Sequence, residues 1–135
     1  MRLLGDSLGI LTAVLFGIAI ANFLVKWINR NWVMKLPKES VFRGGYQTVL
    51  KFLVKNHRFF GFGAAFFMVA HVILQLVFLW ASVTGIITAA IAVAVVALGI
   101  VLYKHKKRSP ALLWAHRGAV IALILAFLVH VITKL

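Results

Sequence analysis

Four histidines lie in apolar segments of this sequence, and they form two pairs with the same spacing. His57 and His71 are fourteen residues apart, and so are His116 and His130. Fourteen residues complete nearly four turns of an α-helix, so each pair shares one helix face, with its members about 21 Å apart along the axis. Imidazole nitrogens bind metals, carry protons and make hydrogen bonds. The spacing therefore predicts a site with two separate levels.

The two segments that carry these histidines are expected to run in the same direction, because one apolar segment lies between them in the sequence. His57 then lies at the depth of His116, and His71 at the depth of His130. Each pair offers the two facing imidazoles that a six-coordinate haem iron requires. We therefore expect two haems, one for each pair. Small residues that would leave room for them are Gly61, Gly63, Ala64, Gly118, Ala119 and Ala126.

Two arginines repeat beside this pattern. Arg58 and Arg117 each follow the first histidine of a pair directly, and we expect them to bind the haem propionates. Gln75 is predicted to make either an interhelical hydrogen bond or a contact to the outer haem or a quinone. His105 lies in a charge run, which favours a solvated loop over a docking patch for an acidic redox partner.

Other chemistry fits these histidines less well. A single intramembrane histidine is often only an interhelical hydrogen bond, but two matched pairs favour ligation. Tetrahedral zinc needs ligands about 2 Å from one metal, which the separation along each helix excludes. Proton relays usually include carboxylates, and the two in this sequence, Asp6 and Glu39, lie outside the predicted spans.

The composition indicates that lipid surrounds most of the chain. Hydrophobic residues make up 64% of the 135 residues, while fifteen Lys and Arg face two acids. The cations flank apolar runs, so lipid phosphate and the positive-inside rule explain them better than nucleic acid does. The absence of cysteine excludes disulfides, iron–sulfur clusters and c-type haem attachment. The sequence shows no glycine-rich dinucleotide fingerprint, and four spans leave no room in it for a flavin or nicotinamide domain.

Four apolar runs are long enough to cross a bilayer. They predict an all-α membrane protein, a four-helix transmembrane bundle with two haems between its second and fourth helices. Residues 1–135 then form one transmembrane haem-binding domain. Ala19-Ile20-Ala21 resembles a signal cleavage site, but Asp6 is unusual in a signal peptide, so we expect a retained span. The predicted spans are residues 8–25, 50–80, 84–103 and 111–132.

The charges also predict an orientation. Two basic loops, residues 26–47 and 104–110, fall on one side of the four spans, and the link at residues 81–83 is uncharged. The positive-inside rule then places these loops in the cytoplasm and both termini outside, in a multi-pass protein of the cell membrane. Aromatic belts at span ends agree with this topology. Their members are Trp27, Trp32, Trp80, Tyr103 and Trp114.

The double histidine motif, on alternate helices of a four-span unit, resembles the di-haem b-type membrane cytochromes. Respiratory cytochrome b subunits and the membrane domains of ferric reductases and NADPH oxidases share it. The resemblance covers about residues 50–133. It implies that His57 and His116 ligate a cytoplasmic-side haem b, and that His71 and His130 ligate an outer one. The chain lacks the further helices of respiratory cytochrome b and the flavin domain of the reductases, which leaves the substrate open.

These observations predict electron transfer across the membrane, from a quinol or cytoplasmic donor to an acceptor such as ferric iron, quinone, superoxide or a partner cytochrome. If the chain is an enzyme, it is then an oxidoreductase. The expected partners are the lipid bilayer and a redox protein or quinone, with no nucleic acid, and a homo-oligomer is left open. The alternative is a haem-carrying structural or sensor subunit of a larger complex, without turnover of its own.

Overall fold

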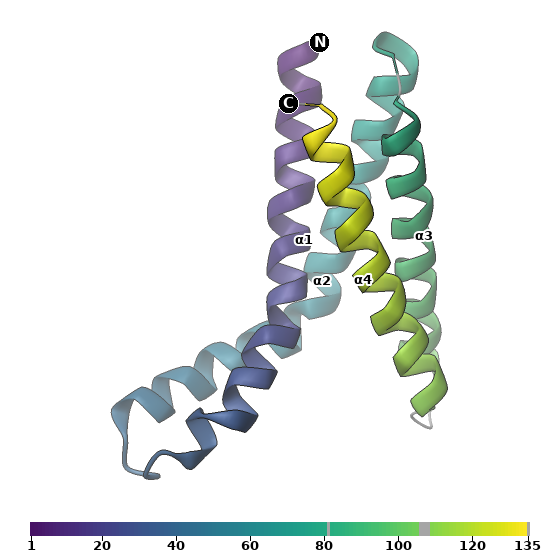
Figure 1. The fold of residues 1–135 in the computed structure, drawn as a ribbon. Helices are drawn as coiled ribbons and strands as arrows, with labels where there is room; N and C mark the ends of the chain where they lie inside the picture. Colours follow the sequence, from purple (N-terminus) through teal and green to yellow (C-terminus); the bar gives the residue numbers. More distant parts are fainter. Residues whose placement is uncertain (81, 106–108, 135) are drawn as a thin grey trace. The chain divides into compact units, whose positions relative to one another are not determined.

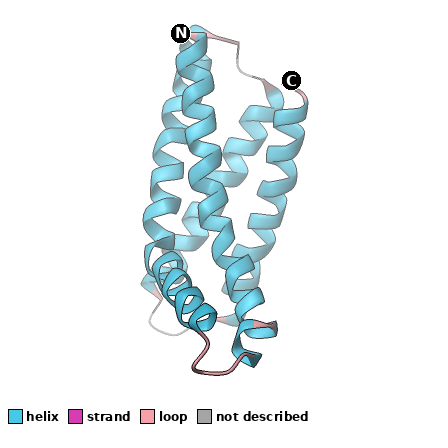
Figure 2. Ribbon diagram, turned by 90° about the vertical axis from the view of Figure 1, so that its left-hand side faces the viewer, coloured by secondary structure: helices cyan, strands magenta, loops and turns pink. Residues whose placement is uncertain are grey.

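The protein is all-α in the part of the chain that the structure describes, residues 1–80, 82–105 and 109–134 of a computed structural model (Figures 1 and 2). Its elements are α1 (Arg2–Asn31), the short 3₁₀ helix η1 (Val33–Lys35), α2 (Val41–Phe78), α3 (Val83–Lys104) and α4 (Pro110–Ile132). Each of the four α-helices is long and apolar enough to cross a membrane. The predicted all-α fold with four helices of membrane-spanning length is therefore confirmed, whereas the two haems between its second and fourth helices stay a prediction.

Local sequence signals fix the beginnings of the last two helices. The Ser82 hydroxyl accepts a hydrogen bond from the Gly85 amide at the start of α3, and the Ser109 hydroxyl accepts one from Leu112 at the start of α4. Pro110 follows as the first residue of α4, where its fixed φ suits a helix and its missing N–H costs nothing. Within the apolar runs a helix satisfies every backbone group without water, which a bilayer demands.

The predicted boundaries hold for the third and fourth spans and are wrong for the basic loop at residues 26–47. There α1 continues to Asn31 and α2 already begins at Val41, so only a short link separates them. Hydropathy marks where lipid-like sequence stops, but tertiary contacts can extend a helix beyond that point even through residues of low helix propensity such as Asn31, Gly44 and Gly45. Ala81, in the predicted uncharged link, and residues 106–108 of the second basic loop lie outside the described residues.

The described residues group into two compact units, of which the first comprises residues 1–9 and 65–135. In this unit α3 and α4 are antiparallel. The Thr88 hydroxyl donates to the Ala126 carbonyl at 3.1 Å, and the Thr84 and Thr133 hydroxyls lie 3.3 Å apart. The first turns of α1 pack beside the end of α2, where the buried Gly5 faces Leu74. Both chain termini lie at this end of the unit (Figure 1).

The second unit comprises residues 10–64 and contains the turn from α1 into α2. Side chains tie the two helices together there: the Tyr46 hydroxyl donates to the Val25 carbonyl at 2.9 Å, and the Gln47 amide donates to the Asn29 side chain. Val33 of η1 is only 2% exposed between them. The polar stretch is therefore a folded helical hairpin.

We predict that Val33→Ala loosens this hairpin, because the lost apolar burial costs about 1–2 kcal/mol. Trypsin should then cleave the detergent-solubilised protein between residues 26 and 58 about tenfold faster, since cleavage follows the population of the opened state. The matched control is Val41→Ala, which removes the same atoms from a side chain that is 91% exposed. Equal cleavage of both variants would show that Val33 does not hold the hairpin.

Candidate functional site

His71 of α2 is fixed against the first turns of α1. Its Nδ1 lies 2.9 Å from the Gly5 carbonyl oxygen. The ring edge rests on Gly9, where an added Cβ would come within 3.2 Å of its Cε1 atom. Gln75, one turn further along α2, also packs against Gly5. The Gln75 side chain therefore faces α1, as the interhelical-contact interpretation expects.

His57 of α2 makes the same kind of contact in the second unit. Its Nδ1 lies 3.2 Å from the Ala19 carbonyl oxygen of α1. A carbonyl only accepts hydrogen bonds, so in both α2 histidines Nδ1 must carry the proton and donate it. A neutral imidazole has one protonated nitrogen, so the lone pair is then on Nε2. In each of these two rings Nε2 is therefore the nitrogen whose chemistry allows it to bind a metal.

His130 of α4 is fixed against the start of α3, but by hydroxyl groups. Its Nδ1 lies 3.2 Å from Thr84 Oγ1 and 3.5 Å from Ser82 Oγ. A Cβ at Gly85 would lie 3.0 Å from the ring's Cε1 atom. A hydroxyl can donate or accept, so these partners hold the ring in place without dictating its tautomer.

His116 of α4 completes the pattern against the far end of α3. A Cβ at Gly99 would lie 3.5 Å from its Cε1 atom, so this ring also rests on a glycine of the preceding helix. Its Nδ1 is buried and has no hydrogen-bond partner among the described residues.

The structure places His71 and His130 in the same unit. Both belong to the first unit, at the end where α2 stops and α3 begins. This is the pair that the sequence register predicts for the outer level. His57 belongs to the second unit and His116 to the first, so the structure describes each of them by itself.

All four rings are half-buried. Nowhere in the described ranges do three His, Asp or Glu side chains gather in a way that could hold a metal ion. Bis-histidine haem ligation takes only two protein ligands for each iron, so it does not require such a cluster.

The two arginines beside the first histidines are exposed, and each has its guanidinium over an aromatic ring of its own helix. Arg58 Cζ lies 4.9 Å from the Phe59 ring centroid, and Arg117 Cζ lies 5.4 Å from that of Trp114. Cation–π contacts of this kind suit the membrane interface, where the charge meets headgroups and the ring meets acyl chains. Their role towards a haem propionate stays a prediction.

The small residues expected to leave room for haems have different surroundings. A methyl group at Gly61 or Gly118 would meet nothing within 4 Å. Gly63, in contrast, faces Leu15 of α1 at 3.3 Å, and Ala126 faces α3. Of the three glycines expected to make room, Gly61 and Gly118 therefore present open space, whereas Gly63 and also Ala126 pack against the neighbouring helices.

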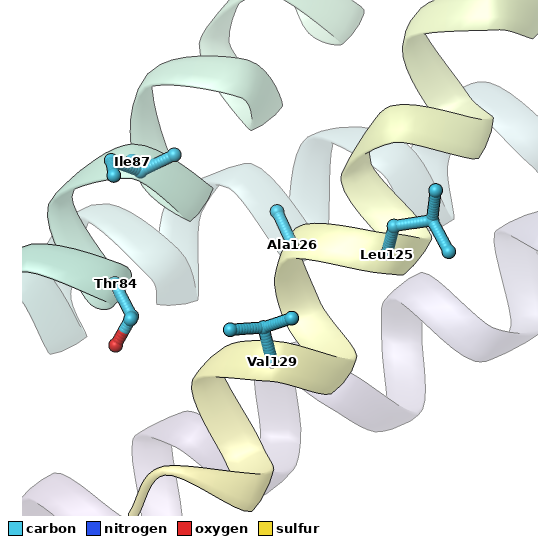
Figure 3. A pocket seen from close by; sticks show the side chains of 5 residues that line it. All are labelled: Thr84, Ile87, Leu125, Ala126 and Val129. Carbon is cyan, nitrogen blue, oxygen red and sulfur yellow. The ribbon is translucent and has the colours of Figure 1, made fainter.

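Ala126 lines an apolar pocket of about 200 Å³ between α3 and α4, beside the His130 contact (Figure 3). Thr84 is its one polar lining residue, and the Thr84 hydroxyl is also a partner of His130 Nδ1. The other lining residues are Ile87, Leu125 and Val129. The apolar lining matches the chemistry of an acyl or isoprenoid chain.

The sequence alone does not predict that glycines pack against the histidine rings. Gly85 and Gly99 stand out as small residues of the third span, but Gly9 gives no special signal. In the structure a histidine ring of the next helix packs against each of these three glycines. The signal that finds them is antiparallel register: positions of one hairpin that lie side by side have nearly the same sum, as 85 with 130 and 99 with 116 both give 215.

No protein-family model, curated protein or solved structure matches this chain. The candidate site therefore rests on the contacts of the four histidines.

We predict that His57 and His71 are Nδ1-protonated in the haem-free protein, because their carbonyl partners accept only. Nitrogen NMR of histidine-labelled protein distinguishes this tautomer from the Nε2-protonated form, with His57→Gln and His71→Gln variants assigning the signals. His105, which is exposed at the end of α3, is the internal control. Finding either α2 histidine protonated on Nε2 would contradict the ligand-presentation argument.

Proposed function

We propose that this chain holds two b-type haems and passes electrons through them across the membrane. The observation that carries the proposal is the set of polar contacts that the histidine Nδ1 atoms make. His57 and His71 have Nδ1 against carbonyls of the preceding helix, and His130 has Nδ1 against hydroxyls. Haem-ligating histidines need this second contact, because it fixes the ring and its ligand nitrogen. The placement of His71 and His130 in one unit, both at the end where α2 stops and α3 begins, supports one complete ligand pair.

In the proposal His71 and His130 hold the outer haem, and His57 and His116 hold the inner one. When bound, each haem iron supplies a one-electron carrier. Two axial imidazoles leave no open coordination position, which favours electron transfer over oxygen chemistry. The protein's own contribution is to fix four rings, exclude water with apolar helices and surround the inner level with cations, among them Arg58 and Arg117.

The proposed orientation follows the positive-inside rule, with both termini outside and the basic segments in the cytoplasm. A quinol or a cytoplasmic protein would then be the donor. The acceptor would be a quinone, ferric iron, superoxide or a partner cytochrome. If electrons end on such a small molecule, the chain is an oxidoreductase. The pocket beside His130 supports a quinone in particular, because Thr84 joins its apolar wall to a ligand histidine.

The proposal is tested with vesicles that contain the haem-loaded protein, trap ferricyanide inside and receive dithionite outside. Neither reagent crosses lipid, so reduction of the trapped ferricyanide reports transmembrane electron transfer. We expect the wild-type protein to bleach ferricyanide and the His71→Ala/His130→Ala protein to leave it oxidised. His105→Ala is the matched histidine control and should behave as wild type. Haems that become reduced while ferricyanide stays oxidised would contradict electron transfer and favour the haem-carrying subunit without turnover.

We predict that His71→Ala removes about half of the bound haem, because a haem held by two axial ligands loses most of its affinity when one is deleted. His116→Ala should remove the other half, and the two substitutions together should remove both haems. Pyridine haemochrome assays and reduced-minus-oxidised spectra measure the content. Retention of both haems in either single variant would refute the assignment of the ligands.

The glycine contacts give a paired prediction. A Cβ at Gly85 would come within 3.0 Å of His130 and also of the Ser82 hydroxyl, whereas a Cβ at Gly99 would have ordinary contact with His116. Gly85→Ala should therefore displace the His130 ring and weaken binding of the outer haem about tenfold, as overpacking costs about 1–3 kcal/mol. Gly99→Ala should leave haem binding unchanged. Haem titration of both apoproteins measures this, and equal affinities would disprove the close packing at Gly85.

A further inference from the structure

The turn between α1 and α2 carries an unusual amount of charge for a membrane protein of this size. We define residues 26–58, all within the second unit, as the basic hairpin. It contains eight of the chain's fifteen Lys and Arg, and Glu39 is its one acidic residue, which gives a net charge of +7. The eight cations are Lys26, Arg30, Lys35, Lys38, Arg43, Lys51, Lys55 and Arg58.

Large aromatic side chains are exposed among these cations. Each of five rings has at least half of its surface exposed. They are Trp27, Trp32, Phe42, Phe52 and Phe59. Water disfavours the rings, and the hydrocarbon core disfavours the cations. The headgroup level of a bilayer suits both, because rings reach the acyl chains there while charged ends stay among the phosphates.

The lengths of α1 and α2 are consistent with a location of the basic hairpin at the headgroup level. With 30 residues in α1 and 38 in α2, the helices are about 45 and 57 Å long, whereas the hydrocarbon core is about 30 Å thick. Part of each helix must therefore lie outside the core or along its surface. The hairpin is also internally fixed: Arg43 donates to the Leu36 carbonyl at 2.7 Å, in addition to the Tyr46 and Gln47 bonds. Its exposed residues thus belong to a structured surface.

We propose that the basic hairpin is a binding surface for anionic phospholipid headgroups of the chain's own bilayer. Charge complementarity selects an anionic surface, and the exposed rings select one that has an apolar layer beneath its charges. An acidic protein partner fits less well, because five of the eight cations are lysines and lysine is depleted in the cores of protein interfaces. The inference is independent of haem.

The test uses full-length protein in nanodiscs that contain equal mole fractions of phosphatidylglycerol and phosphatidylcholine, one of which is brominated. Bromine quenches nearby tryptophans. In the Trp80→Phe/Trp114→Phe protein only Trp27 and Trp32 report. We expect brominated phosphatidylglycerol to quench them at least about twofold more than brominated phosphatidylcholine, since each nearby cation favours the anionic lipid. Other groups quench the tryptophans equally in both preparations, so the ratio of quenching by the two brominated lipids is independent of them. High salt should remove the preference.

Two controls make the result specific. Lys35→Gln/Lys38→Gln/Lys51→Gln/Lys55→Gln should abolish the preference while leaving quenching by brominated phosphatidylcholine and the helical circular dichroism unchanged. Arg2→Gln/Lys134→Gln removes cations near the chain ends and should leave it intact. A protein that keeps only Trp80 should show no preference. Equal quenching by the two lipids, or quenching by soluble acrylamide but by neither lipid, would overturn the proposal, the latter in favour of a surface that faces water or a protein.

Discussion

An imidazole inside a bilayer must have its polar atoms satisfied by the protein, and this constraint organises the chain. An unsatisfied polar group in hydrocarbon costs several kcal/mol, whereas an interhelical side-chain hydrogen bond returns only about 0.6 kcal/mol on average. Here His71 meets a carbonyl of α1, and His130 meets hydroxyls of α3. Glycines at the same places let the rings approach. Such contacts barely offset the cost of the histidines, so stability alone does not account for four of them.

The same arrangement occurs in both antiparallel hairpins. In α1–α2 and in α3–α4, the first helix supplies glycine, carbonyl or hydroxyl, and the second helix supplies the histidines. In His57, His71 and His130 the Nδ1 edge of the ring thus faces the preceding helix or the residue that caps it. The partners differ in strength: His71 donates to a carbonyl, and His130 meets hydroxyls. Because such contacts tune the basicity of a ligand histidine, the two ligands of the proposed outer haem are not equivalent.

Much of this organisation could be predicted from the sequence, because it follows from single-helix periodicity and hydropathy. The four helices long and apolar enough to span a membrane are of this kind. The helical nature of residues 26–31 and 41–47 was not predictable in the same way, because helix ends depend on packing around Val33 and on the Tyr46 bond. The support of His71 by Gly9 depends on register between helices, which no single helix reveals.

Haem stoichiometry and low-temperature electron paramagnetic resonance of the oxidised, purified protein show most directly whether the four histidines are axial ligands. We expect two haems b per chain, both with the low-spin ferric signals of bis-imidazole ligation. A haem-free protein, a single haem, or a high-spin signal from an open iron position would contradict it.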